Sequence, residues 1–330
     1  MATTIEVSAP GKINLYFAVG AVQPNGYHPV ASLYSAVSLR EKVVLSESTT
    51  AGISLSVSLA EDSPLAAMAT TGAFDIAEVP LDERNLAYKA AVAILQAHGL
   101  NATDISINLH LEKAVPVAGG MGGGSADAAA ALVAVNRYVN ARGLVSAELS
   151  TEELLKIAAP LGADVPFALQ GGMAVGLGVG DQLSAVQIPA EAEPLHLVMV
   201  PASYGLSTPA VFAELDQGRA SGQYLQPTEL SVPQDLLDAL QSCVAPMARL
   251  HEIEHYVRND LAAPACSLAP DLKKTLGVQD EAIVGSFVSG SGPTVALLTD
   301  SQESAERIAA ALRRRGKFAV AVQAPDAGAR

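Results

Sequence analysis

The chain has 330 residues and a net charge of −14, and half of its residues are apolar. This composition predicts a globular protein of about two domains. The acidic balance argues against general binding to nucleic-acid phosphates, and no apolar run reaches the roughly 20 residues that cross a bilayer. Cys243 and Cys266 match no metal or redox spacing, and the N-terminus lacks a basic region before an apolar core, so we expect a cytoplasmic protein without membrane partners.

The first half of the chain contains strands and helices in alternation. Apolar residues recur at every second position over 13–19 and 105–111, as in half-buried strands, and 43–45 and 53–59 are weaker strand candidates. Between them, Asn85 to Ala97 reads as a helix with Asn85 as its N-cap. Ser150-Thr-Glu-Glu153 fits a capping box and predicts a helix that ends near residue 162.

The second half, after Gly171-Gly172, begins a new series of elements. We predict strands over 195–200, 283–288, 294–298 and 318–322, and helices that begin at Thr208-Pro209 and cover 233–243 and 304–315. Strands and helices follow no regular βαβ repeat, which favours an α+β fold over one doubly wound sheet. We place the domain boundary between residues 172 and 173.

The segment Val115–Asp127 carries five glycines within positions 119–124, directly before an alanine-rich stretch. Glycines allow positive φ and close approach to a ligand, and the first turn of the helix that follows offers unpaired N–H donors. Together these features are typical of an anion-binding loop. A P-loop would need lysine and then Ser or Thr after Gly124, and a dinucleotide fingerprint fails in every register. We therefore expect a phosphate site, with a plain glycine-rich turn as the alternative.

Other segments carry isolated candidates for chemistry. Lys12 begins an alternating strand, where a lone charge is usually just solvated. Asp164 lies in an apolar segment after a helix, where a carboxylate is either a structural cap or a desolvated functional group. A second glycine-rich turn, Ser289-Gly-Ser-Gly-Pro293, joins two predicted strands.

In their order and amino-acid sequence, these segments resemble those of the GHMP kinase superfamily. Three motifs match: Pro10-Gly-Lys12, the loop from Pro116 to Ser125, and the turn from Ser289 to Pro293. The resemblance implies a two-domain α+β GHMP kinase fold. Residues 1–172 would form an N-terminal ATP-binding domain like domain 2 of ribosomal protein S5, and residues 173–330 a C-terminal substrate-binding domain with a ferredoxin-like α/β plait.

One branch of this superfamily is similar in more detail. Gly26-Tyr-His28 and Leu161-Gly-Ala-Asp-Val-Pro166 resemble the branch that phosphorylates an alcohol carrying a cytidine diphosphate group in the non-mevalonate isoprenoid pathway. The resemblance implies ATP with Mg²⁺ as cofactor and attack of a substrate 2-hydroxyl on the γ-phosphate. It also implies a small-molecule partner with a cytidine diphosphate group, and we expect a monomer or a weak homodimer.

The resemblance also implies roles for individual residues. Lys12 and Asp164 would be the catalytic pair, with Asp164 as base or orienting group for the attacking hydroxyl and Lys12 as its charge partner. Tyr27 would stack on the cytosine, His28 would read its edge, and Phe212 would close the other side. ATP would contact Asn85 and Pro116, Val117, Ala118, Gly119, Gly120, Met121, Gly122, Gly123, Gly124 and Ser125. The substrate would contact Asn14, Tyr27, His28, Tyr34, Phe212, Gly290 and Gly292.

The chain departs from the family's usual motif sequences at two places. It reads Gly124-Ser-Ala-Asp127 where many members read Gly-Ser-Ser-Asn, and Pro10-Gly-Lys12 where many read Pro-Ala-Lys. A carboxylate at Asp127 would repel the phosphates unless it binds magnesium or turns away as a helix cap. No carboxylate cage is evident, so we predict no protein metal ligands and a magnesium ion carried by the nucleotide with mostly water ligands.

Three other functions remain open from the residues alone. Another GHMP-type kinase, for mevalonate, homoserine or a sugar, would share the phosphate loop but would have no use for Gly26-Tyr-His28. A decarboxylase of the same superfamily would release carbon dioxide from mevalonate diphosphate. A nucleotide-binding regulator without catalysis is the third, and the presence of both Lys12 and Asp164 argues against it. Phe212 could equally be a core residue of its helix, and Tyr27 and His28 could be solvated surface residues.

Overall fold

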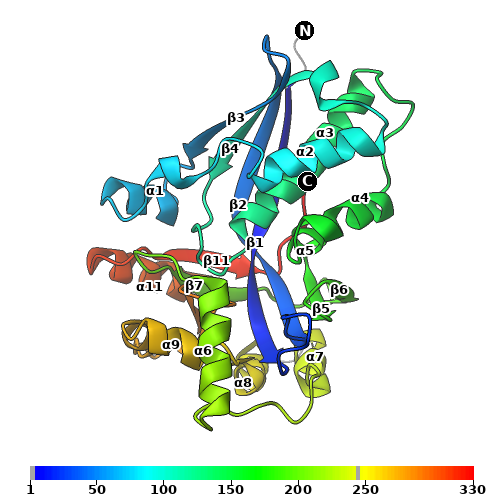
Figure 1. The fold of residues 1–330 in the computed structure, drawn as a ribbon. Helices are drawn as coiled ribbons and strands as arrows, with labels where there is room; N and C mark the ends of the chain where they lie inside the picture. The colour runs from blue at the N-terminus through cyan, green and yellow to red at the C-terminus, as the bar shows by residue number, and fades with distance from the viewer. Residues whose placement is uncertain (1–3, 243–245) are drawn as a thin grey trace.

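The computed structural model describes residues 4–242 and 246–330, which form two lobes joined by two long strands (Figure 1). Strands β1 (Thr4–Val19) and β2 (Val30–Glu47) pair antiparallel along most of their length, with a register shift between Pro10 and Gly11. Both run from the upper lobe of Figure 1 into the lower one. Any residue in the middle of β1 therefore lies between the two lobes.

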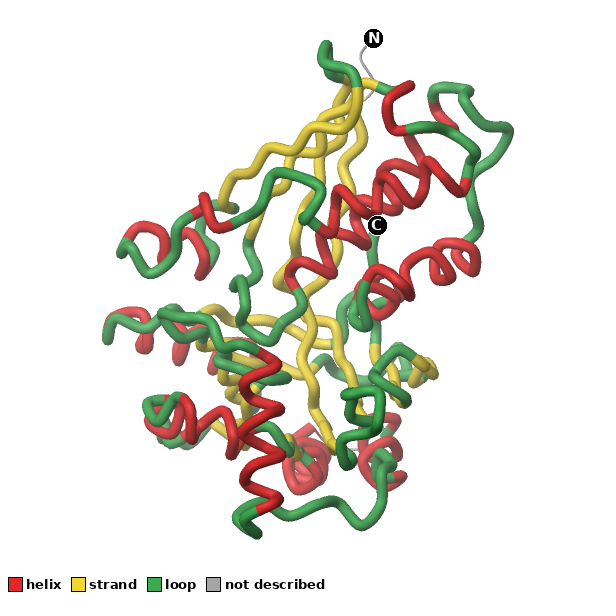
Figure 2. Tube along the Cα trace, viewed as in Figure 1, coloured by secondary structure: helices red, strands yellow, loops and turns green. Residues whose placement is uncertain are grey.

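The first sheet, with seven strands among the described residues, has its main part in the upper lobe and reaches into the lower lobe through the ends of β1 and β2. Its main order is β3-β4-β2-β1-β8, in which β3 (Gly52–Leu59) runs parallel to β4 (Ser106–Lys113), and the short β8 (Arg258–Asn259) runs parallel to β1. Helices α2 (Leu86–Ala97) and α3 (Gly123–Ala141) cover one face of this sheet (Figure 2).

The alanine-rich stretch explains how α3 packs. The side chains of residues 128–131 are fully buried among the apolar residues of β1, β2 and β4. Because alanine adds little bulk, it lets a helix approach the sheet closely and has the highest helix propensity. The N-terminus of α3 is thereby fixed at the end of the sheet that faces the lower lobe.

The hairpin of β5 (Met173–Leu177) and β6 (Gln182–Val186) belongs to the first sheet, because β5 pairs with β2. It follows the small helices α4 (Thr151–Ala158) and α5 (Val165–Gln170). The domain boundary between residues 172 and 173 stays a prediction, since the strands directly after it hydrogen-bond to the first sheet.

The second sheet forms the lower lobe with four antiparallel strands in the order β11-β7-β10-β9. Their bounds are β7 Leu195–Val200, β9 Ile283–Val288, β10 Val295–Thr299 and β11 Val320–Ala324. The remaining helices are α1 Pro64–Thr70 in the upper lobe and α6 Thr208–Ala220, α7 Gln234–Gln241, α8 Pro246–Tyr256, α9 Ala262–Leu268, α10 Leu272–Leu276 and α11 Gln302–Arg314 in the lower lobe.

The α+β class and most predicted elements are confirmed. Asn85 caps α2 through its side chain, and Ser150 and Glu153 form the predicted capping box of α4. The predictions missed the β5–β6 hairpin and the helices α1, α5, α8, α9 and α10. The helix predicted over 233–243 is α7, and Cys243 lies outside the described residues. Cys266 is a buried free thiol.

Two absences apply to residues 4–242 and 246–330. No helix there is both long and apolar enough to cross a bilayer. The same residues contain no group of three or more His, Cys, Asp or Glu side chains arranged to hold a metal ion.

Candidate active site

A cavity of about 930 Å³ is lined by residues of both lobes. With two exceptions, it brings together the site residues predicted from the sequence, from Lys12 to Gly290. Met121 is fully buried and points into the core instead, and Gly292 lies in the turn behind the cavity wall. The cavity is thus one continuous space that reaches residues widely separated in the chain.

The glycine loop forms one end of this cavity and is shaped by left-handed backbone. Gly120 has φ +76° and Gly122, the N-cap of α3, has φ +73°. The loop is fixed to β1 because the Lys12 N–H donates to the Met121 carbonyl over 2.9 Å. The first N–H groups of α3 are left without helical partners and form the positive end of the helix dipole, as an anion site requires.

The second glycine-rich turn packs directly against the loop. The Ser289 hydroxyl donates to the Gly120 carbonyl over 3.2 Å, and the Thr294 N–H donates to the Gly119 carbonyl over 3.3 Å. A Cβ on Gly120 would lie only 2.2 Å from the Ser289 carbonyl oxygen. The two turns therefore fit together only without a side chain at position 120.

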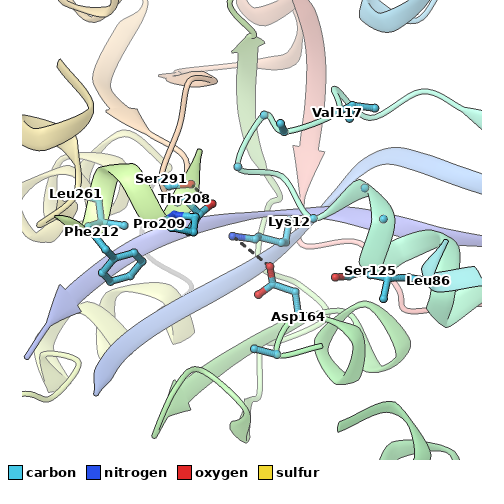
Figure 3. Close-up of a pocket in the computed structure, with 18 of the residues that line it drawn as sticks. Lys12, Leu86, Val117, Ser125, Asp164, Thr208, Pro209, Phe212, Leu261 and Ser291 are labelled. Carbon is cyan, nitrogen blue, oxygen red and sulfur yellow. Dashed lines mark hydrogen bonds and ion pairs between the residues drawn. The ribbon is translucent and has the colours of Figure 1, made fainter. Parts of the chain in front are cut away.

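Lys12 and Asp164 face each other in the middle of the cavity. The Lys12 Nζ atom lies 3.8 Å from Asp164 Oδ2, with side chains 10% and 30% exposed (Figure 3). Asp164 precedes α5, but its side chain makes no capping hydrogen bond. Of the two alternatives left open by the sequence, the geometry therefore favours a carboxylate that faces the cavity.

A chain of polar contacts orients Lys12. Its Nζ donates to Asn14 Oδ1 over 2.8 Å, and the Asn14 amide in turn donates to the Ser32 hydroxyl over 2.7 Å. Nζ also lies 5.7 Å from the centroid of the Tyr34 ring, within reach of a cation–π contact. Burial and the nearby Asp164 carboxylate raise the pKa of Tyr34 well above its ordinary value, so this phenol stays neutral.

The far end of the cavity is aromatic. The His28 ring lies 4.9 Å from the Phe212 ring at an interplanar angle of 34°, and His28 Nε2 lies 2.8 Å from Asp216 Oδ1. Tyr27 lines the cavity and is 63% exposed, whereas Phe212 is partly buried against the core. Figure 3 shows Phe212 and Ser125 on opposite sides of the Lys12–Asp164 pair.

Asn85 and Leu86 line the cavity next to the glycine loop. The Asn85 side chain already has local partners, because Oδ1 accepts from the Ala87 N–H and Nδ2 donates to the Pro80 carbonyl. Leu86 and Val117 add apolar surface to the cavity wall (Figure 3). This apolar surface can accept a flat, largely apolar ring, and the charged Glu78 and Arg84 also line the cavity.

A buried triad of Glu41, Lys113 and Asp127, which the sequence did not predict as a unit, lies beneath the loop, and Lys113 and Asp127 also line the cavity. Lys113 Nζ donates to Glu41 Oε1 over 2.5 Å and to Asp127 Oδ2. Asp127 Oδ1 is buried without a hydrogen-bond partner. Asp127 is not a helix cap, since the N-cap of α3 is Gly122; its charge is turned toward Lys113.

Burial dominates the titration of this triad. It raises the pKa of Glu41 to about 8, against the opposing effect of Lys113, and it raises the pKa of Asp127 as well. Burial alone would lower the pKa of Lys113, but the two carboxylates together raise it above its ordinary value. A signal for the triad was present in the sequence, because Glu41 and Lys113 continue the buried positions of their alternating strands.

Comparison with known proteins agrees with this geometry. The GHMP kinase N-terminal domain matches residues 85–172, and the GHMP kinase C-terminal domain matches residues 246–317. A 4-diphosphocytidyl-2-C-methyl-D-erythritol kinase of Pseudarthrobacter chlorophenolicus is 46% identical over 330 residues, covering 100% of this chain and 95% of the relative.

Solved structures give the same result. A crystal structure of a 4-(cytidine 5'-diphospho)-2C-methyl-D-erythritol kinase has a TM-score of 0.72 and 30% identity, covering 98% of this chain and 100% of the other. Homoserine kinase from Cytophaga hutchinsonii has a TM-score of 0.64 over 99% of this chain and 96% of its own, at 20% identity, and so shares the fold.

The two-domain fold and the matches to both GHMP kinase domains define a GHMP kinase, a class of ATP-dependent kinases, and the predicted fold class is confirmed. Sequence identity over the full chain narrows this class further. The chain belongs to the family of 4-diphosphocytidyl-2-C-methyl-D-erythritol kinases and is a transferase.

Proposed function

We propose that the protein transfers the γ-phosphoryl group of ATP to the 2-hydroxyl of 4-diphosphocytidyl-2-C-methyl-D-erythritol, a step of the non-mevalonate isoprenoid pathway. The observation that carries the proposal is the position of the Lys12–Asp164 pair between the glycine loop and the aromatic end of one cavity. A nucleotide at the first end and a cytidyl group at the second would meet at this pair.

The reaction is an in-line displacement at phosphorus. The substrate oxygen forms a bond to the γ-phosphorus while the bond to the ADP oxygen breaks. Asp164 orients the attacking hydroxyl and accepts its proton. Lys12 is a charge partner for Asp164 at 3.8 Å and offsets the negative charge that develops on the transferring group. Phosphoryl transfer requires mainly such positioning and charge stabilisation from the protein.

The glycine loop holds the ATP phosphates in this proposal. Backbone N–H groups of Gly122 to Ser125 face the β- and γ-phosphates, and the adenine lies against Asn85, Leu86 and Val117. The Asn85 Oδ1 atom already caps α2. Asn85 therefore supports the adenine end by fixing the backbone there, and its side-chain oxygen is not free to contact the base.

Magnesium would be carried by the nucleotide. The Ser125 hydroxyl and the Asp164 carboxylate line the cavity and are oxygen donors of the kind that Mg²⁺ prefers; they would meet the ion mostly through its water ligands. When bound, the ion neutralises phosphate charge. Asp127 also lines the cavity, but its Oδ2 accepts from Lys113, so we assign it no contact with magnesium.

The aromatic end binds the cytidyl group. Tyr27 stacks on the base from the exposed side, Phe212 covers the other side, and His28 reads the edge. Asn14 and Tyr34, which surround Lys12, contact the branched alcohol, and the turn containing Gly290 and Gly292 lies along the substrate diphosphate.

The division of labour between domains is part of the same proposal. Residues 1–172 provide the ATP site, and residues 173–330 provide much of the substrate wall, with Tyr27 and His28 reaching across from the loop between β1 and β2.

The protein acts on its small-molecule substrate as a monomer or a weak homodimer, which analytical ultracentrifugation would test.

The most direct test is an ADP-release assay with four acceptors in parallel: the cytidyl substrate, mevalonate, homoserine and galactose. We expect turnover with the cytidyl substrate alone. Turnover with another acceptor and none with the cytidyl substrate would assign a different GHMP kinase activity. Release of carbon dioxide from mevalonate diphosphate would instead identify a decarboxylase.

Asp164→Asn tests the catalytic pair. The substitution keeps the shape of the side chain but removes the proton acceptor, so we expect kcat to fall by about 10²–10⁴ with the dissociation constant for ATP nearly unchanged. Isothermal titration with ATP and single-turnover kinetics separate the two effects. Unchanged turnover would exclude Asp164 as the base.

A further inference from the structure

His28 is held in the cavity wall by a residue of helix α6. Its Nε2 atom lies 2.8 Å from Asp216 Oδ1, and among the described residues Asp216 is the one hydrogen-bond partner of the ring. The His28 side chain is 7% exposed and that of Asp216 is 37% exposed. Since both residues line the cavity, the pair connects a nearly buried imidazole to a carboxylate at the cavity surface.

Helix α6 makes two contacts with this imidazole. Phe212 and Asp216 are four residues apart and therefore project from the same face of the helix. Phe212 packs on the ring at a centroid distance of 4.9 Å, and Asp216 bonds to its Nε2. One contact restrains the position of the ring, and the other restrains its rotation.

The hydrogen bond also determines which ring nitrogen carries the proton. An ionised carboxylate can only accept, so Nε2 must donate to Asp216. A neutral imidazole has one N–H, and its tautomer is set by the hydrogen bond that one nitrogen makes. Nδ1 of His28 is therefore left as an acceptor.

We propose that Asp216 makes the cavity specific for cytosine over uracil by holding His28 in the tautomer whose Nδ1 accepts a hydrogen bond. The inference rests on the proposed function, in which His28 reads the edge of the base. Cytosine has an amino donor at position 4, where uracil has a carbonyl acceptor. An acceptor at Nδ1 pairs with the amino group and opposes the carbonyl, which leaves two buried acceptors unpaired. Asp216 is a positioning residue, because it acts through His28.

The tautomer can be measured in the whole protein by ¹⁵N NMR of the histidine rings over an alkaline pH series, because the two nitrogens of a neutral ring give separate signals. The signals of His28 are assigned by their loss in His28→Gln. We expect a protonated Nε2 and an unprotonated Nδ1 in the wild type. Asp216→Lys places a donor-only group beside Nε2 and is expected to reverse the two. A protonated Nδ1 in the wild type would overturn the proposal.

Specificity is measured as the ratio of kcat/KM for the cytidyl substrate to kcat/KM for its uridyl analogue. We expect a ratio of about 100 or more in the wild type, a fall of at least about tenfold in Asp216→Lys, and recovery of most of the ratio in Asp216→Glu, which keeps the acceptor. Gln217→Lys is the matched control, because it adds the same side chain at the adjacent exposed position of α6 and should keep the ratio.

Two failures are distinguishable in this experiment. An unchanged ratio in Asp216→Lys overturns the role of Asp216 while the proposed kinase activity stands. Absence of wild-type turnover with both pyrimidine substrates contradicts the proposed function itself, and the NMR measurement still decides whether Asp216 sets the tautomer.

Discussion

Two carboxylates share one ammonium in the buried triad of Glu41, Lys113 and Asp127. Burial keeps the pKa of Glu41 near 8 in the folded protein, against an ordinary value of 4.5. The folded chain therefore retains a proton that the unfolded chain has lost at intermediate pH. The free energy of unfolding contributed by this group is fully present below about pH 4.5 and is lost as the pH rises through about 8.

Asp127→Asn should make the protein more stable at alkaline pH. It removes one of the two carboxylates and leaves Lys113 paired with Glu41 alone, so we expect the free energy of unfolding at about pH 8 to increase by about 1–3 kcal/mol. The loss of stability between about pH 5 and pH 8 should shrink. Urea unfolding at several pH values measures both effects, with Glu61→Gln at an exposed position as control. An unchanged pH slope would show that the triad does not share a proton.

Tyr27→Ala should weaken substrate binding far more than ATP binding. Tyr27 is 63% exposed, so its loss should leave the fold intact, and stacking of a base on an aromatic ring is worth about 1–3 kcal/mol. We expect KM for the cytidyl substrate to rise about tenfold or more and KM for ATP to stay constant. Leu225→Ala, at a position 86% exposed, is the control, and equal losses for both substrates would contradict a stacking role.

Several residue roles could not be read from the sequence, because they depend on contacts between distant segments. The alternation that predicted β4 continues to Lys113, yet only the fold shows that Glu41 and Asp127 surround its ammonium. Asp216 follows Phe212 by one helical turn, but His28 is 188 positions away from it. Local patterns locate such side chains on a face of an element and leave their partners undetermined.

At the scale of elements, the glycine loop and the turn from Ser289 to Pro293 behave as one unit. The Thr294 N–H and the Ser289 hydroxyl donate hydrogen bonds to the loop carbonyls, and the position of Gly120 against the Ser289 carbonyl leaves no room for a methyl group. Because Lys12 also bonds to this loop through its backbone, a shift of the loop would move the lysine away from Asp164.

Gly120→Ala should therefore separate this unit. Both its φ of +76° and the 2.2 Å approach to Ser289 oppose a Cβ, so we expect ATP affinity to fall by at least about tenfold and the melting temperature to drop. Gly99→Ala is a matched control, since Gly99 has φ +71° but open space around a Cβ and should cost only about 1 kcal/mol of stability. Equal effects of the two substitutions on ATP affinity would refute the packing argument.

Elements with a local cause were predicted well. Asn85 and Ser150 predict where their helices begin, because their side chains accept hydrogen bonds from first-turn N–H groups. The β5–β6 hairpin was missed because its strands are short and β6 is mostly exposed, so no alternation of buried residues marks it. Helix α5 was missed because Pro166 and a length of six residues hide its period.

At the scale of the whole molecule, the last residues of the chain return to the first sheet. The five N–H groups of Arg40 are all used: they donate to Ser8 Oγ and its carbonyl, to Asp326, and to the carbonyls of Ala327 and Gly328. The Ala329 N–H also donates to the Leu169 carbonyl at the end of α5. This contact links the lower lobe, the sheet and the helix that follows Asp164.

Arg40→Lys should destabilise the protein, because lysine cannot reproduce the planar set of five donors. We expect a loss of about 2–4 kcal/mol in the free energy of unfolding, measured by urea denaturation. Arg142→Lys is the control, because the Arg142 side chain is 46% exposed in its ion pair with Glu47 and exposed pairs contribute less than about 1 kcal/mol. Similar losses in both variants would show that the contacts of Arg40 are not cooperative.

The passage of β1 and β2 through both lobes has a consequence for which molecules fit. One β-ladder carries the loop contact at Lys12 and, about 23 Å further along at 3.3 Å per residue, the end of β1 at Val19, just before the loop that bears Tyr27 and His28. A paired ladder does not stretch, so in the proposed function the span between the reacting centre and the base has one length. We therefore expect that a cytidine monophosphate ester, shorter by one phosphate, occupies either end but does not reach both at once.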